Sequence, residues 1–156
     1  MWADADVTRF IGGKPASRED VWNRLLRYRG LWALLGYGYW AVSERETGRY
    51  VGDVGFADFH RDITPSLDGA PEVGWALATW AHGKGFATEA VQAALAWGDS
   101  HLEGRHGEPM RYVCLISPEN TGSVRVAEKC GFSRAHEATY KGHPTTVHER
   151  FAQSKV

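Results

Sequence analysis

Cysteine is scarce in this chain of 156 residues: there are only two, Cys114 in an apolar run and Cys130 in a segment of helical pattern. So few thiols exclude a disulfide framework, and buried free thiols in a reducing compartment are the simplest interpretation. A single domain of this length buries roughly two thirds of its unfolded surface, so it needs no covalent staple. We therefore expect a cytoplasmic protein that folds as one domain over residues 1–156.

Long apolar runs and a large net charge are also absent. The longest apolar stretch, Leu31 to Val42, is interrupted by two glycines and is shorter than the ~20 residues that cross a bilayer. The first ten residues carry charged side chains and no apolar core, so they do not form a signal peptide. The formal net charge of -1 gives no bulk electrostatic attraction to nucleic acid or anionic membranes. Small molecules or protein segments are the expected partners.

The seven histidines raise the question of a metal site. They include two pairs, His101 with His106 and His143 with His148, whose members are five residues apart. That spacing does not place two imidazoles on one helical face, and the chain has no His-Glu-x-x-His motif. We therefore predict that the protein binds no metal.

Hydrophobic periodicity predicts the elements of the first half of the chain. Ser17 and Asp20 resemble a variant capping box, and apolar residues then recur at helical spacing up to Gly36. Aromatic and β-branched runs over 37–44 and 50–58 indicate an antiparallel hairpin. Residues 60–71, with two prolines and a glycine, indicate a loop.

The second half alternates between strands and helices. A short strand over 73–78 leads into a glycine loop, and the helix after it is expected to end near Gly104. The nearly continuous apolar run 111–116 suits a strand buried on both faces beside a parallel neighbour. A helix over 122–129 and two strands joined through 142–144 follow. This order (α, β, β, β, α, β, α, β, β) predicts a mixed α/β (α+β) sheet with a central strand–glycine loop–helix unit.

The glycine loop itself has the layout of a phosphate-binding site. The first amides of a helix have no intrahelical acceptor, and the helix dipole adds positive charge there. Gly83 and Gly85 allow positive φ and a close backbone approach, while Lys84 adds charge and Thr88 a hydroxyl. We therefore predict a phosphorylated cofactor, with a plain glycine-containing loop as the alternative for the local pattern alone.

Two familiar phosphate motifs do not fit this loop. A Walker loop needs Lys-Ser/Thr directly after its second glycine, but Gly85 is followed by Phe86 and Ala87. A dinucleotide fingerprint needs a third glycine where this chain has Thr88. The loop belongs to neither class.

Two further blocks, Asn-Thr-Gly-Ser at 120–123 and Lys-Cys-Gly-Phe at 129–132, lie downstream of the glycine loop. Together with that loop they make roughly residues 8–150 resemble the GNAT N-acetyltransferases, and the RimJ/RimL type is the most similar branch. The family pattern Gln/Arg-x-x-Gly-x-Gly/Ala is matched at Gly85 and Ala87, whereas His82 replaces the usual Gln or Arg.

The resemblance implies acetyl-CoA as cosubstrate, without a metal. Its pyrophosphate would lie on the glycine loop, and its pantetheine arm would pair with the preceding strand like an added strand. Asn120 is also a candidate helix N-cap that accepts from the amide of Gly122 or Ser123. The residues implied in cofactor binding are Trp75, Ala76, Leu77, His82, Gly83, Lys84, Gly85, Phe86, Ala87, Thr88, Asn120 and Ser123.

The resemblance also suggests catalytic residues. Glu72 occupies a position where this branch often carries a glutamate that takes a proton from the amine, and a surface glutamate is the alternative interpretation. The amide of Gly74, where the family has a strand bulge, could polarise the thioester carbonyl. Many relatives use a tyrosine as proton donor to sulfur, but the aligned residue here is Ala127. We propose Ser123, four residues earlier, as the replacement, with a first-turn serine that satisfies backbone amides as the alternative.

The acceptor site of this family is usually built around the first helix and hairpin. Four aromatic residues gather there, and an aromatic wall would suit an aliphatic or cationic amine, although core packing is the alternative. These candidate substrate-binding residues are Trp32, Tyr37, Tyr39 and Trp40. The leading prediction is direct acetyl transfer to a primary amine, either a protein amino terminus or a small molecule.

One departure concerns the start of the fold, because the strand that usually precedes the first helix of GNAT proteins is missing. Three explanations are open: the sheet does without this strand, another chain supplies an edge, or the start site of the sequence lies downstream of the true one. An uncovered edge would favour self-association, so a homodimer is one expected assembly. With Ala127 and His82, this departure motivates a rival prediction, a non-catalytic acetyl-CoA-binding module. A nucleotide-phosphate-binding protein is the third.

Overall fold

The computed structural model describes residues 1–153, apart from the side chain of Arg105. The α-helices are α1 (Ala5–Thr8), α2 (Arg18–Leu35), α3 (Phe86–His101) and α4 (Thr121–Lys129), with short 3-10 turns η1 (Thr79–Ala81) and η2 (Arg105–Gly107). The strands are β1 (Tyr39–Ser43), β2 (Tyr50–Ala57), β3 (Glu72–Leu77), β4 (Arg111–Ile116), β5 (Ser133–Tyr140) and β6 (His143–Phe151). The predicted order of the longer helices and strands is confirmed; α1 and the 3-10 turns were not predicted.

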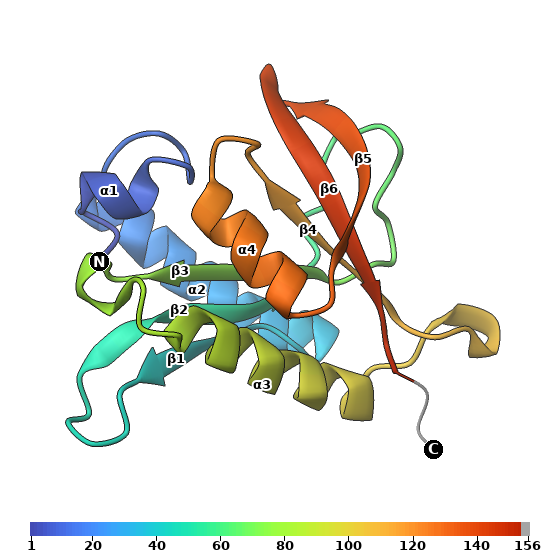
Figure 1. Ribbon diagram of the computed structural model, residues 1–156, viewed down its shortest axis with the longest axis horizontal. Helices are drawn as coiled ribbons and strands as arrows, with labels where there is room; N and C mark the ends of the chain where they lie inside the picture. Colours follow the sequence, from blue (N-terminus) through green and yellow to red (C-terminus); the bar gives the residue numbers. More distant parts are fainter. Residues whose placement is uncertain (154–156) are drawn as a thin grey trace.

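The six strands form one sheet in the order β1-β2-β3-β4-β6-β5 (Figure 1). All neighbours are antiparallel except β3 and β4, which are parallel as the apolar run of β4 indicated. Their register joins only Glu72 with Val113, and the two strands then diverge (Figure 1). The sheet is therefore split at its centre, and this split positions the site.

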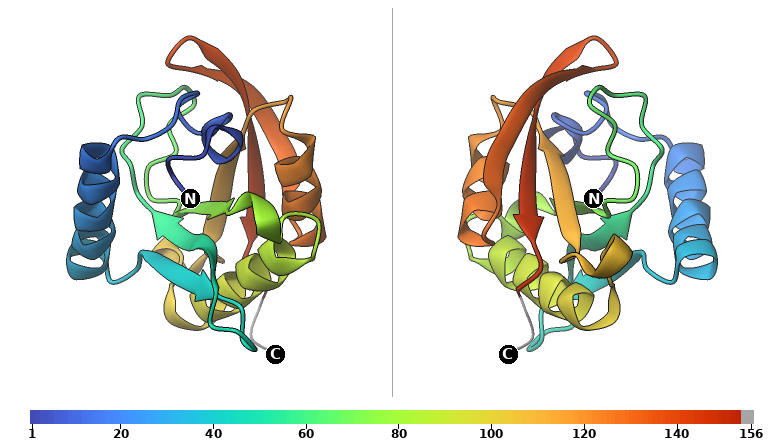
Figure 2. Two further views of the ribbon diagram at one scale, coloured as in Figure 1. Left: turned by 90° about the vertical axis from the view of Figure 1, so that its left-hand side faces the viewer. Right: turned by 90° about the vertical axis from the view of Figure 1, so that its right-hand side faces the viewer.

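Helices cover both faces of the sheet. Helix α2 lies on one face, while α3 and α4 lie on the other (Figure 2). The main core fills the space between the sheet and α3, with Val54, Phe56, Val91 and Leu95 nearly inaccessible to solvent. A smaller cluster that includes Tyr28 lies under α2. The predicted mixed α/β architecture is confirmed.

Local chemistry explains where two of these elements begin. Ser17 Oγ accepts from the amide of Asp20 at 3.1 Å, and the Asp20 carboxylate accepts from the amide of Ser17 at 2.9 Å, which confirms the capping box. The last hairpin turns through Lys141 and Gly142 alone, so its predicted turn over 142–144 is too long. Both residues have positive φ, the two-residue geometry that matches strand twist, and β6 therefore begins at His143.

No strand precedes α2 within residues 1–153, as predicted, and β1 forms one edge of the sheet. Within the same residues, no helix combines the length and the apolar character needed to cross a membrane.

Candidate active site

The glycine loop presents backbone donors to open space. Gly83 and Gly85 have φ of +73° and +87°, and a Cβ added to either would meet no atom within 4 Å. Gly85 is the N-cap of α3, and no side chain caps the helix there. The first amides of α3 thus have no side-chain partner at the cap, which is the condition that the predicted phosphate site requires.

The side chains of the glycine loop contact different neighbours. His82 Nε2 lies 2.9 Å from the carbonyl oxygen of Leu77, so the imidazole ties the loop back to the end of β3. Lys84 Nζ lies 5.1 Å from the centre of the Trp80 ring, and Phe86 contacts the same ring edge-on at 5.9 Å. The ring of His82 is therefore engaged with the backbone, which leaves the loop amides and Lys84 as the groups that could meet an anion.

The split between β3 and β4 adds a second set of backbone groups. Trp75, Ala76 and Leu77 pair with β2 on one side, but their other side faces the divergence. In residues 1–153 the register pairs none of these three with β4. An extended chain that carries amides could therefore add to this edge of β3, which is the fit expected for a pantetheine arm.

Helix α4 follows β4 and begins at an asparagine cap. Asn120 Oδ1 accepts from the amide of Ser123 at 3.1 Å, so the predicted N-cap is confirmed. Ser123 is half-buried in the first turn of the helix, and Ala127 is fully buried one turn later. Ser123 is therefore partly accessible to solvent, whereas Ala127 is not.

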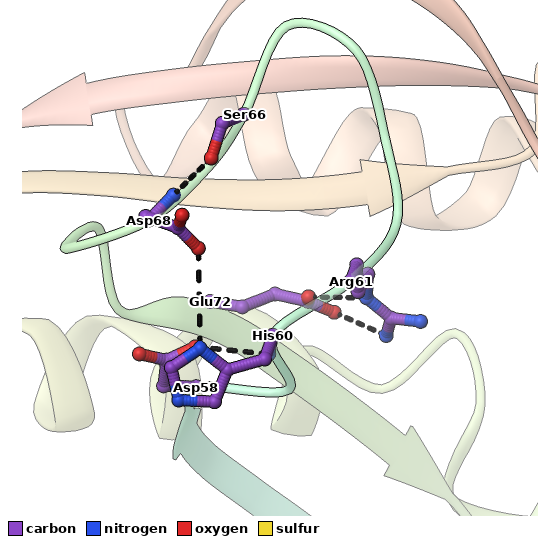
Figure 3. A network of polar contacts seen from close by, with 6 residues as sticks. All are labelled: Asp58, His60, Arg61, Ser66, Asp68 and Glu72. Atoms are coloured by element: carbon purple, nitrogen blue, oxygen red, sulfur yellow. Dashed lines mark hydrogen bonds and ion pairs between the residues drawn. The ribbon is translucent and has the colours of Figure 1, made fainter.

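Glu72 forms a bidentate ion pair that the sequence did not reveal. Arg61 Nε donates to Oε2 at 2.6 Å and Nη2 donates to Oε1 at 2.7 Å (Figure 3). The two side chains are only 21% and 12% exposed. Burial opposes the charge of Arg61, but its bonds to Glu72 and Tyr140 raise its pKa above the ordinary value. Glu72 is therefore a fixed carboxylate at the split, and not a solvated surface glutamate.

The side chain of Tyr39 extends from the edge strand β1 toward β3, the strand that carries Glu72. Its ring stacks on Tyr28 of α2 with centroids 4.5 Å apart. In the sheet register Tyr39 of β1 pairs with Gly55 of β2, and Gly55 pairs with Gly74 of β3. The tyrosine ring therefore lies over two neighbouring glycines. Its hydroxyl lies so close to Gly74 that a Cβ there would be 2.0 Å from it. Burial, with the nearby Tyr28 and Glu72, raises the pKa of Tyr39, so the hydroxyl stays protonated beside Glu72.

The other predicted acceptor residues lie elsewhere. Trp32 and Trp40 contact each other and Trp97 of α3 edge-on, at 4.9 to 5.6 Å. Trp40 and Trp97 line a groove of about 770 Å³ between the β1 edge and α3. Tyr37 packs edge-on against Phe56 at 6.3 Å. Of the four aromatic residues, the structure brings Tyr39 to Glu72 and leaves the other three around the β1 edge.

No group of three or more His, Cys, Asp or Glu side chains that could hold a metal ion occurs in residues 1–153. The residues that sequence reasoning missed are Arg61 and the two rings around it. The guanidinium carbon of Arg61 lies 4.7 Å from the centres of both Phe59 and Tyr140. These residues belong to a loop and a distant strand, where no periodic signal points to a common site.

A family model described as the acetyltransferase (GNAT) domain matches residues 1–133. The chain belongs to the GNAT family of acetyltransferases. It is 30% identical over 156 residues to YkkB of Bacillus subtilis (strain 168), an uncharacterised protein, and the match covers 96% of this chain and 81% of that protein. The resemblance seen in the sequence is thus confirmed at the level of the family.

Solved structures of other acetyltransferases have the same fold as this chain. A putative GNAT-family acetyltransferase from Bordetella pertussis has a TM-score of 0.77 and 31% identity, and covers 90% of this chain and 81% of its own. Spermidine N-acetyltransferase from Vibrio cholerae, solved with CoA and spermine, shares the fold at 17% identity, with a TM-score of 0.69 and coverage of 96% and 85%. The protein is an acetyltransferase whose structural neighbours include a CoA complex.

Proposed function

We propose that the protein transfers the acetyl group of acetyl-CoA directly to a primary amine. The observation that carries this proposal is that Glu72, the residue of β3 whose register partner lies in β4, marks the point where the two strands part. The proposed proton acceptor therefore lies at the apex of the split whose free strand edge suits the cosubstrate. The glycine loop at the other end of β3 supplies amides for its pyrophosphate.

The chain's own residues would divide the chemistry among them. Acetyl-CoA, when bound, supplies a thioester carbon that the amine nitrogen attacks, so that a C–N bond forms, the C–S bond breaks and sulfur leaves with the electron pair. Glu72 would accept one proton from the amine, directly or through water. The Ser123 hydroxyl would donate a hydrogen bond to the departing sulfur. The bulge expected at Gly74 is absent, because β3 stays in register with β2 over Glu72–Leu77, so the Gly74 amide faces Gly55 and is not assigned to the carbonyl oxygen.

The class of acceptor is a further part of the proposal. The RimJ/RimL resemblance favours a protein amino terminus, and the Vibrio cholerae neighbour, a spermidine N-acetyltransferase, makes a small-molecule amine an equal candidate. Tyr39 is the aromatic side chain that supports an acceptor site next to Glu72, because its hydroxyl lies over Gly74. A single domain over residues 1–156 and a homodimer through the free β1 edge remain predictions.

Thiol release from acetyl-CoA tests the proposal. The purified protein is assayed against amino-terminal peptides, polyamines, amino acids and amino sugars, with an acceptor-free blank. We expect release above the blank with one class, a loss of about 100-fold or more in kcat for Glu72→Gln, and a smaller loss for Ser123→Ala. Full activity of Glu72→Gln at every pH would remove the proton-acceptor role, because the amide cannot take a proton.

The rival function is a non-catalytic acetyl-CoA-binding module. It is favoured by His82, whose ring is bonded to Leu77 instead of facing the loop, and by the buried Ala127 at the position of the usual tyrosine. Calorimetry separates the two functions. Tight acetyl-CoA binding, together with no thiol release above the blank for any acceptor in the panel, would establish the module and exclude the enzyme.

A further inference from the structure

The loop between β2 and β3 contains the arginine that pairs with the proposed proton acceptor. Arg61 lies eleven residues before Glu72 in the sequence. Two nitrogens of its guanidinium donate hydrogen bonds to the two carboxylate oxygens of Glu72 (Figure 3). Charge-assisted pairs of this geometry fix orientation as well as charge, because the planar guanidinium matches the carboxylate plane. Glu72 is therefore held by a partner from outside the sheet.

We propose that Arg61 is a positioning residue for catalysis: it holds the Glu72 carboxylate in one orientation at the apex of the split, ready for the acceptor amine. The inference rests on the proposed role of Glu72 as proton acceptor. A carboxylate oxygen has two lone pairs, so the bonds to Arg61 leave one on each oxygen for the amine or a bridging water. Arg61 itself does not touch the reacting atoms in this scheme.

Arg61 is fixed as firmly as the carboxylate it holds. Its guanidinium carbon lies 4.7 Å from the centre of the Phe59 ring and 4.7 Å from the centre of the Tyr140 ring. Phe59 precedes the loop and Tyr140 ends β5, so the brace joins both halves of the split sheet to Glu72. Two rings this close to the guanidinium limit its movement away from Glu72.

Two other titratable groups that face Glu72 have raised pKa values and stay protonated. Burial, with Tyr28 and Glu72, raises the pKa of the Tyr39 hydroxyl from the β1 side. Burial, with Glu72 and Cys130, also raises the pKa of the Cys114 thiol on β4. Tyr140 faces Arg61 from β5. Arg61 is thus the charged partner that the structure places in direct contact with the Glu72 carboxylate.

The loop has its own anchors, so the role of Arg61 can be tested without losing the fold. Ile63 and Ala70 are buried with Val113 and Val147 under the loop. His60 adds contacts of 3.8 and 3.9 Å to Asp58 and Asp68 at its base (Figure 3). Replacement of Arg61 should therefore release Glu72 while the loop stays in place.

A kinetic double-mutant cycle tests the proposal, with the most active panel member as acceptor. Arg61→Met should lower kcat about 10- to 100-fold and leave the KM for acetyl-CoA within about 2-fold, because a misplaced catalytic group mainly slows chemistry. Arg61→Lys keeps the charge without the fork and should restore only part of the loss. In the Glu72→Gln background, Arg61→Met should change kcat by less than about 2-fold.

The matched control is Arg27→Met, which removes an exposed guanidinium 5.3 Å from the centre of the Phe59 ring but no bond to Glu72. Its kcat should stay within about 2-fold of the native value, because the carboxylate keeps its partner. Should Arg61→Met lower kcat by the same factor in the native protein and in the Glu72→Gln background, Arg61 acts on the fold alone and the proposal is overturned.

Urea unfolding of the same variants without acetyl-CoA supplies a readout that does not depend on activity. Arg61→Met and Glu72→Gln should each lower the midpoint, and the double variant should fall no further than the less stable single variant. Full activity of Glu72→Gln would refute the proton-acceptor role while this unfolding cycle still shows whether the pair is coupled. Additive midpoint losses would refute the pair itself.

Discussion

Replacement of Gly74 by alanine tests the contact between the sheet edge and the split. A Cβ at this position would lie 2.0 Å from the Tyr39 hydroxyl oxygen and 3.1 Å from the ring carbon that carries it. The tyrosine ring cannot retreat without cost, because it stacks face to face on Tyr28 with a 9° angle between the planes. We therefore expect Gly74→Ala to displace Tyr39 and to strain this cluster.

Overpacking of this kind destabilises proteins by about 1–3 kcal/mol, so Gly74→Ala should lower the free energy of unfolding by that amount. Tyr39→Phe removes the oxygen that lies nearest to the new Cβ, although the ring carbon at 3.1 Å still leaves a tight contact. The double variant should therefore recover about 1 kcal/mol relative to the sum of the single effects, as expected for residues in contact.

Urea unfolding of the four proteins measures this coupling. Gly30→Ala is the control, because Gly30 lies inside α2 and a Cβ there meets no atom within 4 Å. An alanine in a helix interior should stabilise the protein by about 0.5–1 kcal/mol. Strict additivity of Gly74→Ala and Tyr39→Phe would refute the geometry, since the tyrosine oxygen would then not occupy the space over Gly74.

Three other predictions concern buried groups. Arg150→Met breaks a bidentate pair with Asp99 at 2.7 and 2.9 Å and should lower the free energy of unfolding by about 2–4 kcal/mol, whereas Arg134→Met breaks an exposed pair with Glu137 and should change it by less than about 1 kcal/mol. Burial lowers the pKa of His148 below 6.5, so the unfolded chain takes up a proton that the folded chain does not; stability should fall as pH drops below about 6.5, and less steeply in His148→Leu. Burial raises the pKa of both cysteine thiols, so a disulfide reagent at pH 8 should modify them only after unfolding.

Helix and strand positions could be predicted from the sequence because their signals are local. The capping box at Ser17 needs only Asp20 three residues later, and the cap at Asn120 needs only the amide of Ser123. The apolar run of β4 likewise indicated a strand with a parallel neighbour before any partner was known. Each inference depends on residues within one turn or one strand, which is the range that periodicity covers.

The aromatic residues show where that reasoning was too coarse. Tyr39 and Trp40 are adjacent in β1, so their side chains must point to opposite faces of the sheet. One joins Tyr28 under α2, and the other joins Trp97 of α3. Strand alternation alone would have divided the predicted aromatic wall, because neighbouring strand residues cannot line the same face.

The ion pair at Glu72 lay beyond sequence reasoning for a different reason. Arg61 belongs to an irregular loop, and its rings come from Phe59 and from Tyr140, which lies in a strand of the other half of the chain. No spacing rule relates a loop residue to a strand so far along the chain. The sequence could indicate that a carboxylate at the start of β3 needs a partner, but only the folded loop identifies that partner.

The positions proposed for the chemistry share a physical feature: each lies where regular structure stops. Glu72 is where pairing between β3 and β4 ends, Gly85 is the uncapped start of α3, and Asn120 caps α4 beside Ser123. Backbone groups inside helices and sheets are already satisfied, so donors and acceptors for a ligand remain at these ends. At the first of these ends, the pair between Arg61 and Glu72 adds a fixed charge.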